Sequence, residues 1–153
     1  MDELRDDFPH SPARAAVVAV VRGYGFVQRH MEPYFARFGL TPPQFQVLTI
    51  LNRLREQRPT QRRLGRELYV SFPNVTMMLG RLEQAGLVRR RSNPDDRREK
   101  FVALTPRGAA LLRRIWREHQ QQLDRIVAGL MPDEQATLAR LLNKMIELNH
   151  REG

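Results

Sequence analysis

The sequence has no cysteine among its 153 residues, which excludes disulfide bonds, thiolate metal sites and cysteine-based redox or peroxide sensing. Its four histidines, at positions 10, 30, 119 and 150, lack metal-ligand spacing, so we expect no metal ion and no cofactor. No apolar run approaches the roughly 20 residues that span a bilayer. The first residues are acidic, whereas a signal peptide begins with positive charge. We therefore expect a soluble, cytoplasmic protein without a membrane partner.

Enzyme motifs are missing as well. The sequence has no glycine-rich phosphate loop, no nucleophile elbow and no paired His-Glu motif. The adjacent carboxylates Asp95 and Asp96 lie in an arginine-rich turn, which suits general acid catalysis poorly. The sequence therefore favours a binding protein over an enzyme.

Lysine is rare, and the positive charge is unevenly placed. Only two of the 26 basic residues are lysines, and the net charge is +9. From Arg53 to Lys100 there are 13 basic and 6 acidic residues, a net of +7, whereas the other 105 residues have a net of +2. An arginine-biased genome accounts for the choice of arginine but not for the clustering. The cluster indicates a polyanionic partner, most commonly nucleic acid.

The spacing of apolar residues predicts mainly helices in the first half of the chain. Residues 1–12 are polar and contain two prolines, which is typical of a loose tail. Apolar residues then recur every three to four positions from Ala13 to Phe38, which predicts one long amphipathic helix. Three residues with N-cap chemistry predict shorter helices after it: Thr41, Thr60 and Ser71.

The pattern changes after Gly86, which we expect to end the fourth helix. Residues 87–91 and 100–104 have the composition of short strands, and turn-forming residues separate them. Prolines at positions 106 and 132 then open two further helices. The expected fold is mainly α with a small β-hairpin wing, in the order α-α-α-α-β-β-α-α, which is the layout of a winged helix-turn-helix.

Four motifs occur in a characteristic order: LTPPQFQVL at 40–48, LEQAGLVRR at 82–90, NPDDRR at 93–98 and LTPRG at 104–108. With them the sequence resembles the MarR (multiple antibiotic resistance regulator) family of bacterial transcription factors, over roughly residues 40–146. The family signature Asp-x-Arg, five residues, Leu-Thr falls on Asp96, Arg98, Leu104 and Thr105.

The resemblance implies a function and a division of the chain. Residues 41–104 would form the winged helix-turn-helix lobe that binds double-stranded DNA, and residues 13–40 and 105–150 would intertwine with a second copy as a homodimer. Such a protein is a transcriptional regulator, by family default a repressor, on a pseudo-palindromic operator. The alternatives are a monomer with a helical cap, or a non-specific DNA- or RNA-binding protein; RNA recognition usually uses exposed aromatic residues, of which the basic segment has few.

In the motif class, the N-terminal residues of the fourth helix point at base edges in the major groove. The resemblance assigns this role to Pro73, Asn74, Thr76 and Met77. Asparagine suits adenine, and methionine suits a thymine methyl group. Family members often carry arginine where Met77 stands, and its alternative is ordinary packing. Gly80 is unusual in a helix interior, and we expect it to allow close approach of a neighbouring helix.

The wing should enter the minor groove through Arg98, because narrow minor grooves attract arginine. Asp96 should hold the guanidinium of Arg98 in a bidentate pair, unless Asp95 and Asp96 are turn formers only. Arg97 is the third residue assigned to the wing. A further set of residues is expected to contact phosphates, with a solvated surface as the alternative for each. This set is Gln61, Arg62, Arg63, Ser71, Arg81, Arg89, Arg90 and Arg91.

The resemblance also implies release of DNA by a small effector, commonly an aromatic or phenolic acid, in a cleft beside the dimerisation region. A histidine on a helix is more often structural than a ligand contact, and Trp116 is more typical of a core or an interface. The residues that we expect to line such a cleft are Arg22, Tyr24, Arg29, His30, Met31, Tyr34 and Phe45.

Overall fold

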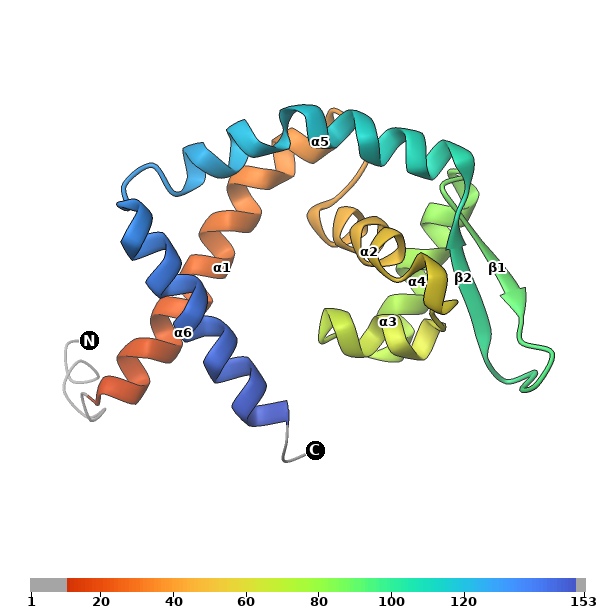
Figure 1. Cartoon of the computed structure of the whole chain (residues 1–153), viewed down its shortest axis with the longest axis horizontal. Helices are drawn as coiled ribbons and strands as arrows, with labels where there is room; N and C mark the ends of the chain where they lie inside the picture. Colours follow the sequence, from red (N-terminus) through yellow and green to blue (C-terminus); the bar gives the residue numbers. More distant parts are fainter. Residues whose placement is uncertain (1–10, 151–153) are drawn as a thin grey trace, which may run out of the picture. The chain divides into compact units, whose positions relative to one another are not determined.

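The computed structural model describes residues 11–150, and the first ten residues of the predicted tail lie outside this range. Pro12, expected in the tail, is instead the first residue of a helix. The elements follow the predicted order with one added 3-10 turn (Figure 1): α1 Pro12–Ala36, α2 Pro42–Arg53, η1 Arg55–Gln57, α3 Gln61–Leu68, α4 Phe72–Gln84, β1 Val88–Ser92, β2 Lys100–Leu104, α5 Pro106–Ile126 and α6 Pro132–His150.

Side-chain caps define where several helices begin. Thr41 forms a capping box with Gln44, in which each side chain bonds the other residue's backbone N–H. Thr60 caps α3 in the predicted way. Ser71 has the extended backbone of an N-cap, but its hydroxyl makes no capping hydrogen bond to α4. The side chain of Ser71 therefore does not occupy the free backbone N–H groups at the start of α4.

The hairpin is antiparallel, and its register runs from Val88 opposite Leu104 to Ser92 opposite Lys100. Successive strand residues point to opposite faces, so Val88, Arg90 and Val102 share one face of the hairpin. Val88 and Val102 are buried there. The pairs Arg89–Ala103 and Arg91–Phe101 therefore occupy the outer face.

The joint between the hairpin and α5 is tightly packed. The Thr105 hydroxyl donates to the Gly86 carbonyl oxygen at 2.6 Å and accepts from the Gly108 backbone N–H at 3.0 Å. A Cβ added to Gly108 would lie 2.1 Å from the carbonyl oxygen of Leu87. Glycine is required at this position because a side chain would collide with backbone.

The chain divides into two compact units, and residues 11–115 belong to the first. The core of this unit draws on α2, α3, α4, the hairpin and the first half of α5. Side chains with relative exposure below 2% fill this core, and their packing fixes the positions of the elements. These residues are Val47, Leu48, Leu51, Leu54, Leu64, Val75, Leu79, Leu82, Val88, Val102, Leu112 and Ile115.

The second unit, from Trp116 onward, contains the end of α5 and α6. The spacing predicts an inner apolar face on these helices, but in the single chain much of this face is exposed. Trp116 is 41% exposed, Leu123 40% and Leu141 50%. Several large apolar residues of α1, including Val21 at 65%, are exposed as well.

Candidate nucleic-acid interface

The start of α4 presents a mixed polar and apolar surface. Pro73, Asn74 and Met77 are exposed, Met77 by 53%. Their positions, i, i+1 and i+4, lie on one side of a helix, opposite the buried Val75 and Leu79. The packing alternative for Met77 is therefore excluded within the chain. Unpaired N–H groups and the helix dipole make this end attractive to anions.

Thr76 and Gln61 are each held by hydrogen bonds within the protein. The Thr76 hydroxyl donates to the Phe72 carbonyl oxygen at 3.0 Å and accepts from the Gln61 side-chain amide. Gln61 is only 5% exposed. Gln61 therefore joins α3 to α4 and does not reach outward as the predicted phosphate contact does. The sequence pattern gives no signal of this bond, which depends on how two helices pack.

The other arginines at this end of α3 are available to solvent. Arg62 pairs with Glu99 at 3.5 Å and Arg63 with Glu67 at 3.9 Å, and both arginine side chains are well exposed. Exposed pairs of this kind contribute roughly 0–1 kcal/mol and weaken in salt. Both arginines can therefore exchange their carboxylate for a phosphate at little cost. Arg81 and Ser71 on α4 are also exposed.

Arg90 differs from its neighbours on β1. Its guanidinium donates to Glu83 Oε2 from Nε at 2.9 Å and from Nη2 at 2.6 Å, and its backbone N–H donates to Glu83 Oε1 at 3.0 Å. These hydrogen bonds hold the pKa of Glu83 below its usual range. Arg90 therefore fastens the hairpin to α4, whereas the predicted phosphate contacts Arg89 and Arg91 are exposed.

The wing tip is shaped by backbone contacts of acidic and amide side chains. Asn93 Oδ1 accepts from the Asp95 N–H at 3.0 Å, and Asp96 Oδ1 accepts from the Arg98 N–H at 2.9 Å. The predicted carboxylate–guanidinium pair of Asp96 and Arg98 is thus replaced by an Asx turn, because a spacing of two residues suits the backbone amide. Arg97 and Arg98 are exposed.

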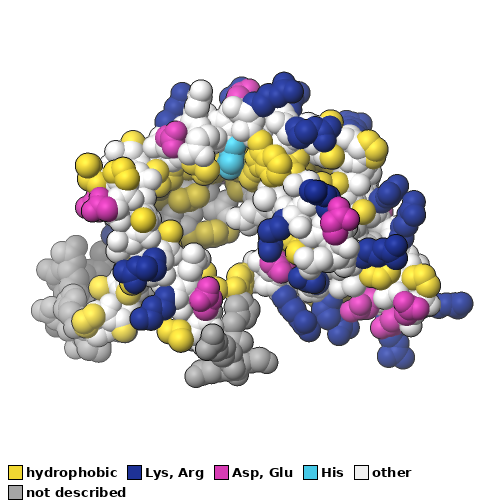
Figure 2. All heavy atoms as spheres, in the orientation of Figure 1, with side chains coloured by type: hydrophobic (Ala, Val, Ile, Leu, Met, Phe, Trp, Pro, Cys, Tyr) yellow, Lys and Arg dark blue, Asp and Glu magenta, His cyan; other side chains and the backbone are white. Residues whose placement is uncertain are grey.

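A recess of about 210 Å³ joins these parts of the first unit. It brings the wing arginine Arg98 beside the first turn of α4, at Phe72 and Thr76. Lys100 and Phe72, which is 54% exposed, were not among the predicted site residues. The sequence feature that could have indicated Phe72 as a site residue is its place directly after the N-cap of α4. Dark blue basic side chains gather around the hairpin and the helices beside it (Figure 2).

The predicted effector residues fall into two groups. Met31, Tyr34 and Phe45 are buried in the first unit, where the Tyr34 hydroxyl donates to the Ile115 carbonyl oxygen at 3.1 Å. The others are exposed along α1, and none of the seven lines the three hollows that the structure shows among residues 51–109. The exposed group is Arg22, Tyr24, Arg29 and His30.

Among residues 11–150, no group of three or more histidine and acidic side chains is placed to hold a metal ion. In the same part of the chain, no helix is long and apolar enough to cross a membrane. His119 is half-buried, and burial lowers its pKa.

Sequence and structure comparisons identify relatives with this architecture. A sequence model of the MarR family matches residues 40–100. The multiple antibiotic resistance protein MarR of Salmonella typhimurium is 34% identical over 119 residues, covering 77% of this chain and 81% of the relative. This chain belongs to the MarR family. MhqR of Bacillus subtilis, an HTH-type transcriptional regulator, is 29% identical over 88% of this chain and 91% of its own.

Solved MarR-family structures have the same fold. A cysteine-to-serine mutant of E. coli MarR, complexed with operator DNA, is 28% identical with a TM-score of 0.76, covering 89% of this chain and 99% of that one. Sco3205 of Streptomyces coelicolor, in complex with DNA, has a TM-score of 0.80 at 23% identity, covering 94% and 92%, and supports the fold alone. The winged helix fold is thereby confirmed, and the MarR family is one of DNA-binding transcriptional regulators.

Proposed function

We propose that this MarR-family protein is a homodimeric repressor that binds a specific pseudo-palindromic DNA sequence. The observation that carries the proposal is the recess between α4 and the wing, where Arg98 lies beside the first turn of α4. In this arrangement the helix reads the major groove while the wing enters the neighbouring minor groove. Asn74 and Met77 are the exposed residues placed to contact bases.

A second copy is needed to complete the site, because one helix and one wing cover only half of an operator. The exposed apolar residues of α1, α5 and α6 support a homodimer. Exposed large apolar residues repeated along one helix are unusual in a monomer and indicate an interaction site. Regulation by a small aromatic or phenolic acid is the part of the proposal that rests on the family alone.

Selection from random DNA duplexes tests the proposal. We expect enrichment of an inverted repeat whose half-sites lie about 10 base pairs apart, centre to centre. Enrichment of a single half-site would contradict the dimer. Equal retention of all sequences would identify a non-specific nucleic-acid binder instead.

Salt dependence provides a second test with the selected duplex. Each phosphate neutralised by an arginine releases counterions, so the logarithm of the binding constant should fall by roughly 0.9 per contact for each unit of log salt. We expect a steep slope for the dimer. A flat plot would contradict the assignment of the α3 and wing arginines to phosphates.

A further inference from the structure

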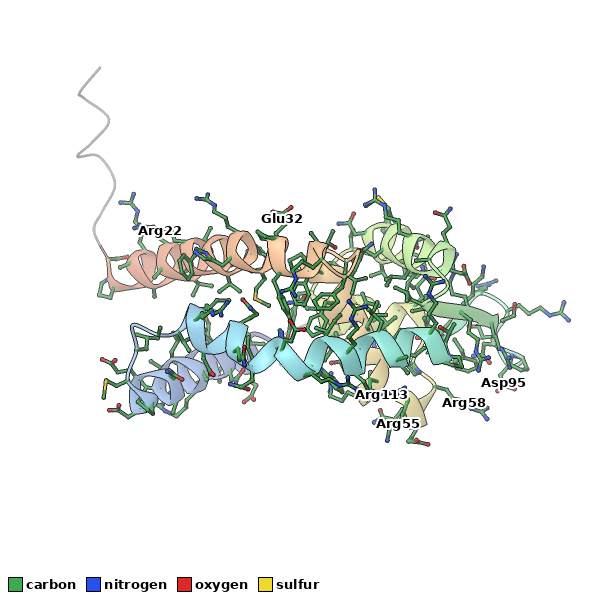
Figure 3. All side chains as sticks on the ribbon, turned by 90° about the horizontal axis from the view of Figure 1, so that it is seen from above. Arg22, Glu32, Arg55, Arg58, Asp95 and Arg113 are labelled. Carbon is green, nitrogen blue, oxygen red and sulfur yellow. The ribbon has the colours of Figure 1, made fainter. Side chains whose placement is uncertain are left out.

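Sulfur occurs in this chain only in methionine, because cysteine is absent. The sequence has six methionines, and all except Met1 lie among the described residues, whose sulfur atoms are yellow in Figure 3. Their exposure differs widely: Met31 is 5% exposed, Met145 38%, Met77 53% and Met131 65%. An oxidant in solution therefore reaches Met77 and Met131 before it reaches Met31.

Met77 is the exposed methionine of the candidate nucleic-acid interface. It follows Pro73 by four residues and Asn74 by three, so these side chains share one side of α4. Arg81, one turn further along the helix, is exposed as well. Met78 is next in the sequence but is half-buried. A chemical change at the sulfur of Met77 therefore alters the surface that α4 presents to DNA.

The opposite side of α4 holds the helix in place. Val75 and Leu79 are 0% exposed. The Thr76 hydroxyl accepts a hydrogen bond from the side-chain amide of Gln61, which joins α4 to α3. These contacts do not use the side chain of Met77. Oxidation of Met77 should therefore change the surface of α4 without unfolding the helix.

A thioether reacts with a hypohalous acid without a catalytic base, because its sulfur carries free lone pairs at every pH. With hypochlorous acid, the sulfur gives up two electrons and gains the oxygen atom, which forms a sulfoxide. Chlorine leaves with those electrons as chloride, and the proton of the acid passes to water. The product is polar and chiral, and methionine sulfoxide reductases return it to the thioether.

We propose that Met77 is a reversible oxidation site, at which a hypohalous acid converts the thioether to a sulfoxide and thereby weakens DNA binding. This inference rests on the proposed function. The sulfoxide oxygen accepts hydrogen bonds, but base pairs present more acceptors than donors in the major groove, and phosphates present only acceptors. Removing the sulfoxide from water without a donor is costly, whereas a thioether packs against a thymine methyl group.

Treatment of the full-length protein with graded amounts of hypochlorous acid tests the proposal. Peptide mass spectrometry measures the sulfoxide at each methionine, and fluorescence anisotropy measures affinity for the selected duplex. We expect Met77 and Met131 to be oxidised before Met31. As the Met77 sulfoxide forms, the affinity should fall by at least about tenfold. Methionine sulfoxide reductases should restore the affinity of the treated protein.

Two leucine variants assign the loss of affinity to one sulfur atom. Leucine is apolar and close to methionine in volume, but it has no sulfur to oxidise. Met77→Leu should keep its own starting affinity after the treatment. Met131→Leu, the matched exposed control, should lose affinity as the unsubstituted protein does. Met77→Gln places a polar group there without an oxidant, and it should bind at least about tenfold more weakly than Met77→Leu.

Three outcomes would overturn the proposal. They are equal loss of affinity in Met77→Leu and the unsubstituted protein, full affinity with Met77 completely oxidised, and oxidation of Met77 no faster than that of Met31. The mass spectra are recorded without DNA, so the order of oxidation is independent of the proposed function. Untreated protein that selects no duplex would contradict the proposed function alone, and the same comparison on an unselected duplex would then test Met77.

Discussion

The two units of the chain place their apolar residues in opposite ways. In the first unit, Val47, Leu64 and Ile115 are 0% exposed, and helices and hairpin enclose them completely. In the second unit, Leu138 is 46% exposed and Leu141 is 50% exposed. The first unit therefore encloses a core with its own residues, although part of its helix α1 is exposed, whereas in the single chain the apolar face of α6 stays in contact with water. Substitutions in the core of the first unit should therefore affect folding, whereas substitutions on the apolar face of α6 should affect self-association.

The largest effect is expected in the second unit. Leu141→Asp would place a charge in the proposed dimer interface, where an unpaired buried charge costs about 3–5 kcal/mol, so the dimer dissociation constant should rise by at least about a hundredfold. Sedimentation equilibrium measures this change. Arg140→Asp, at the adjacent exposed position on α6, is the matched control and should remain dimeric. Unchanged self-association of Leu141→Asp would remove α6 from the interface.

The joint between the hairpin and α5 should give the next largest effect, this time on folding. Gly108→Ala would force a Cβ to 2.1 Å from the Leu87 carbonyl oxygen. The free energy of unfolding, measured in urea, should fall by about 3 kcal/mol.

Gly80→Ala is the matched control for this substitution. Nothing lies within 4 Å of a Cβ added at Gly80, so close approach of a neighbouring helix does not account for this glycine within the single chain. This variant should stabilise the protein by up to about 1 kcal/mol, since alanine favours a helix interior. A destabilised Gly80→Ala protein would mean that a contact absent from the single chain forms there.

Within the first unit, the wing arginines should separate binding from folding. Arg98→Ala should weaken operator binding by about 1–3 kcal/mol without lowering stability, because its side chain is exposed. Arg90→Ala should instead lower stability, because Glu83 loses its partner. Filter binding and urea unfolding of both variants measure the contrast. Equal behaviour of the two would show that the hairpin faces are assigned incorrectly.

The smallest effect concerns pH. The pKa of Glu83 is lowered in the folded state, chiefly by the hydrogen bonds from Arg90. The stability from this pair is therefore fully present above the unfolded value of about 4.3 and is lost as pH falls through the lower folded pKa. Wild type and Glu83→Gln should differ by no more than about 1 kcal/mol at pH 7, because the side chain is partly exposed, and should converge in acid. A constant difference across pH would contradict the assignment.

Local chemistry was sufficient to predict most elements from sequence. The capping box at Thr41 and the turn formers at the wing tip act through neighbours two or three residues away, so the sequence contains both partners. The same holds for the hairpin itself, because turn-forming residues separate two segments that pair as antiparallel strands. Periodicity located the apolar faces of α5 and α6, but it does not show what covers them, and in the single chain Trp116, Leu123 and Leu141 are exposed.

Site residues were harder to predict, because tertiary contacts decide which polar groups remain free. Gln61 was expected to reach outward, but its partner Thr76 comes from the next helix. The position of Arg90 could have been predicted from the sequence, because side chains two residues apart in a strand point to the same face. Val88 is an inward-facing strand residue, so Arg90 must share its face. Arg89 and Arg91 then follow as the outward pair.

The carboxylate of Glu99 beside Arg62 lowers the positive charge of the region around the hairpin. A chromosome offers millions of incorrect sites, and affinity for them depends on net positive charge. Glu99, with Asp95 and Asp96 at the wing tip, offsets part of the arginine charge in this region. In a DNA-binding protein, carboxylates at this place would weaken attraction to the phosphate backbone of any sequence, and discrimination between sequences would then depend more on contacts with bases.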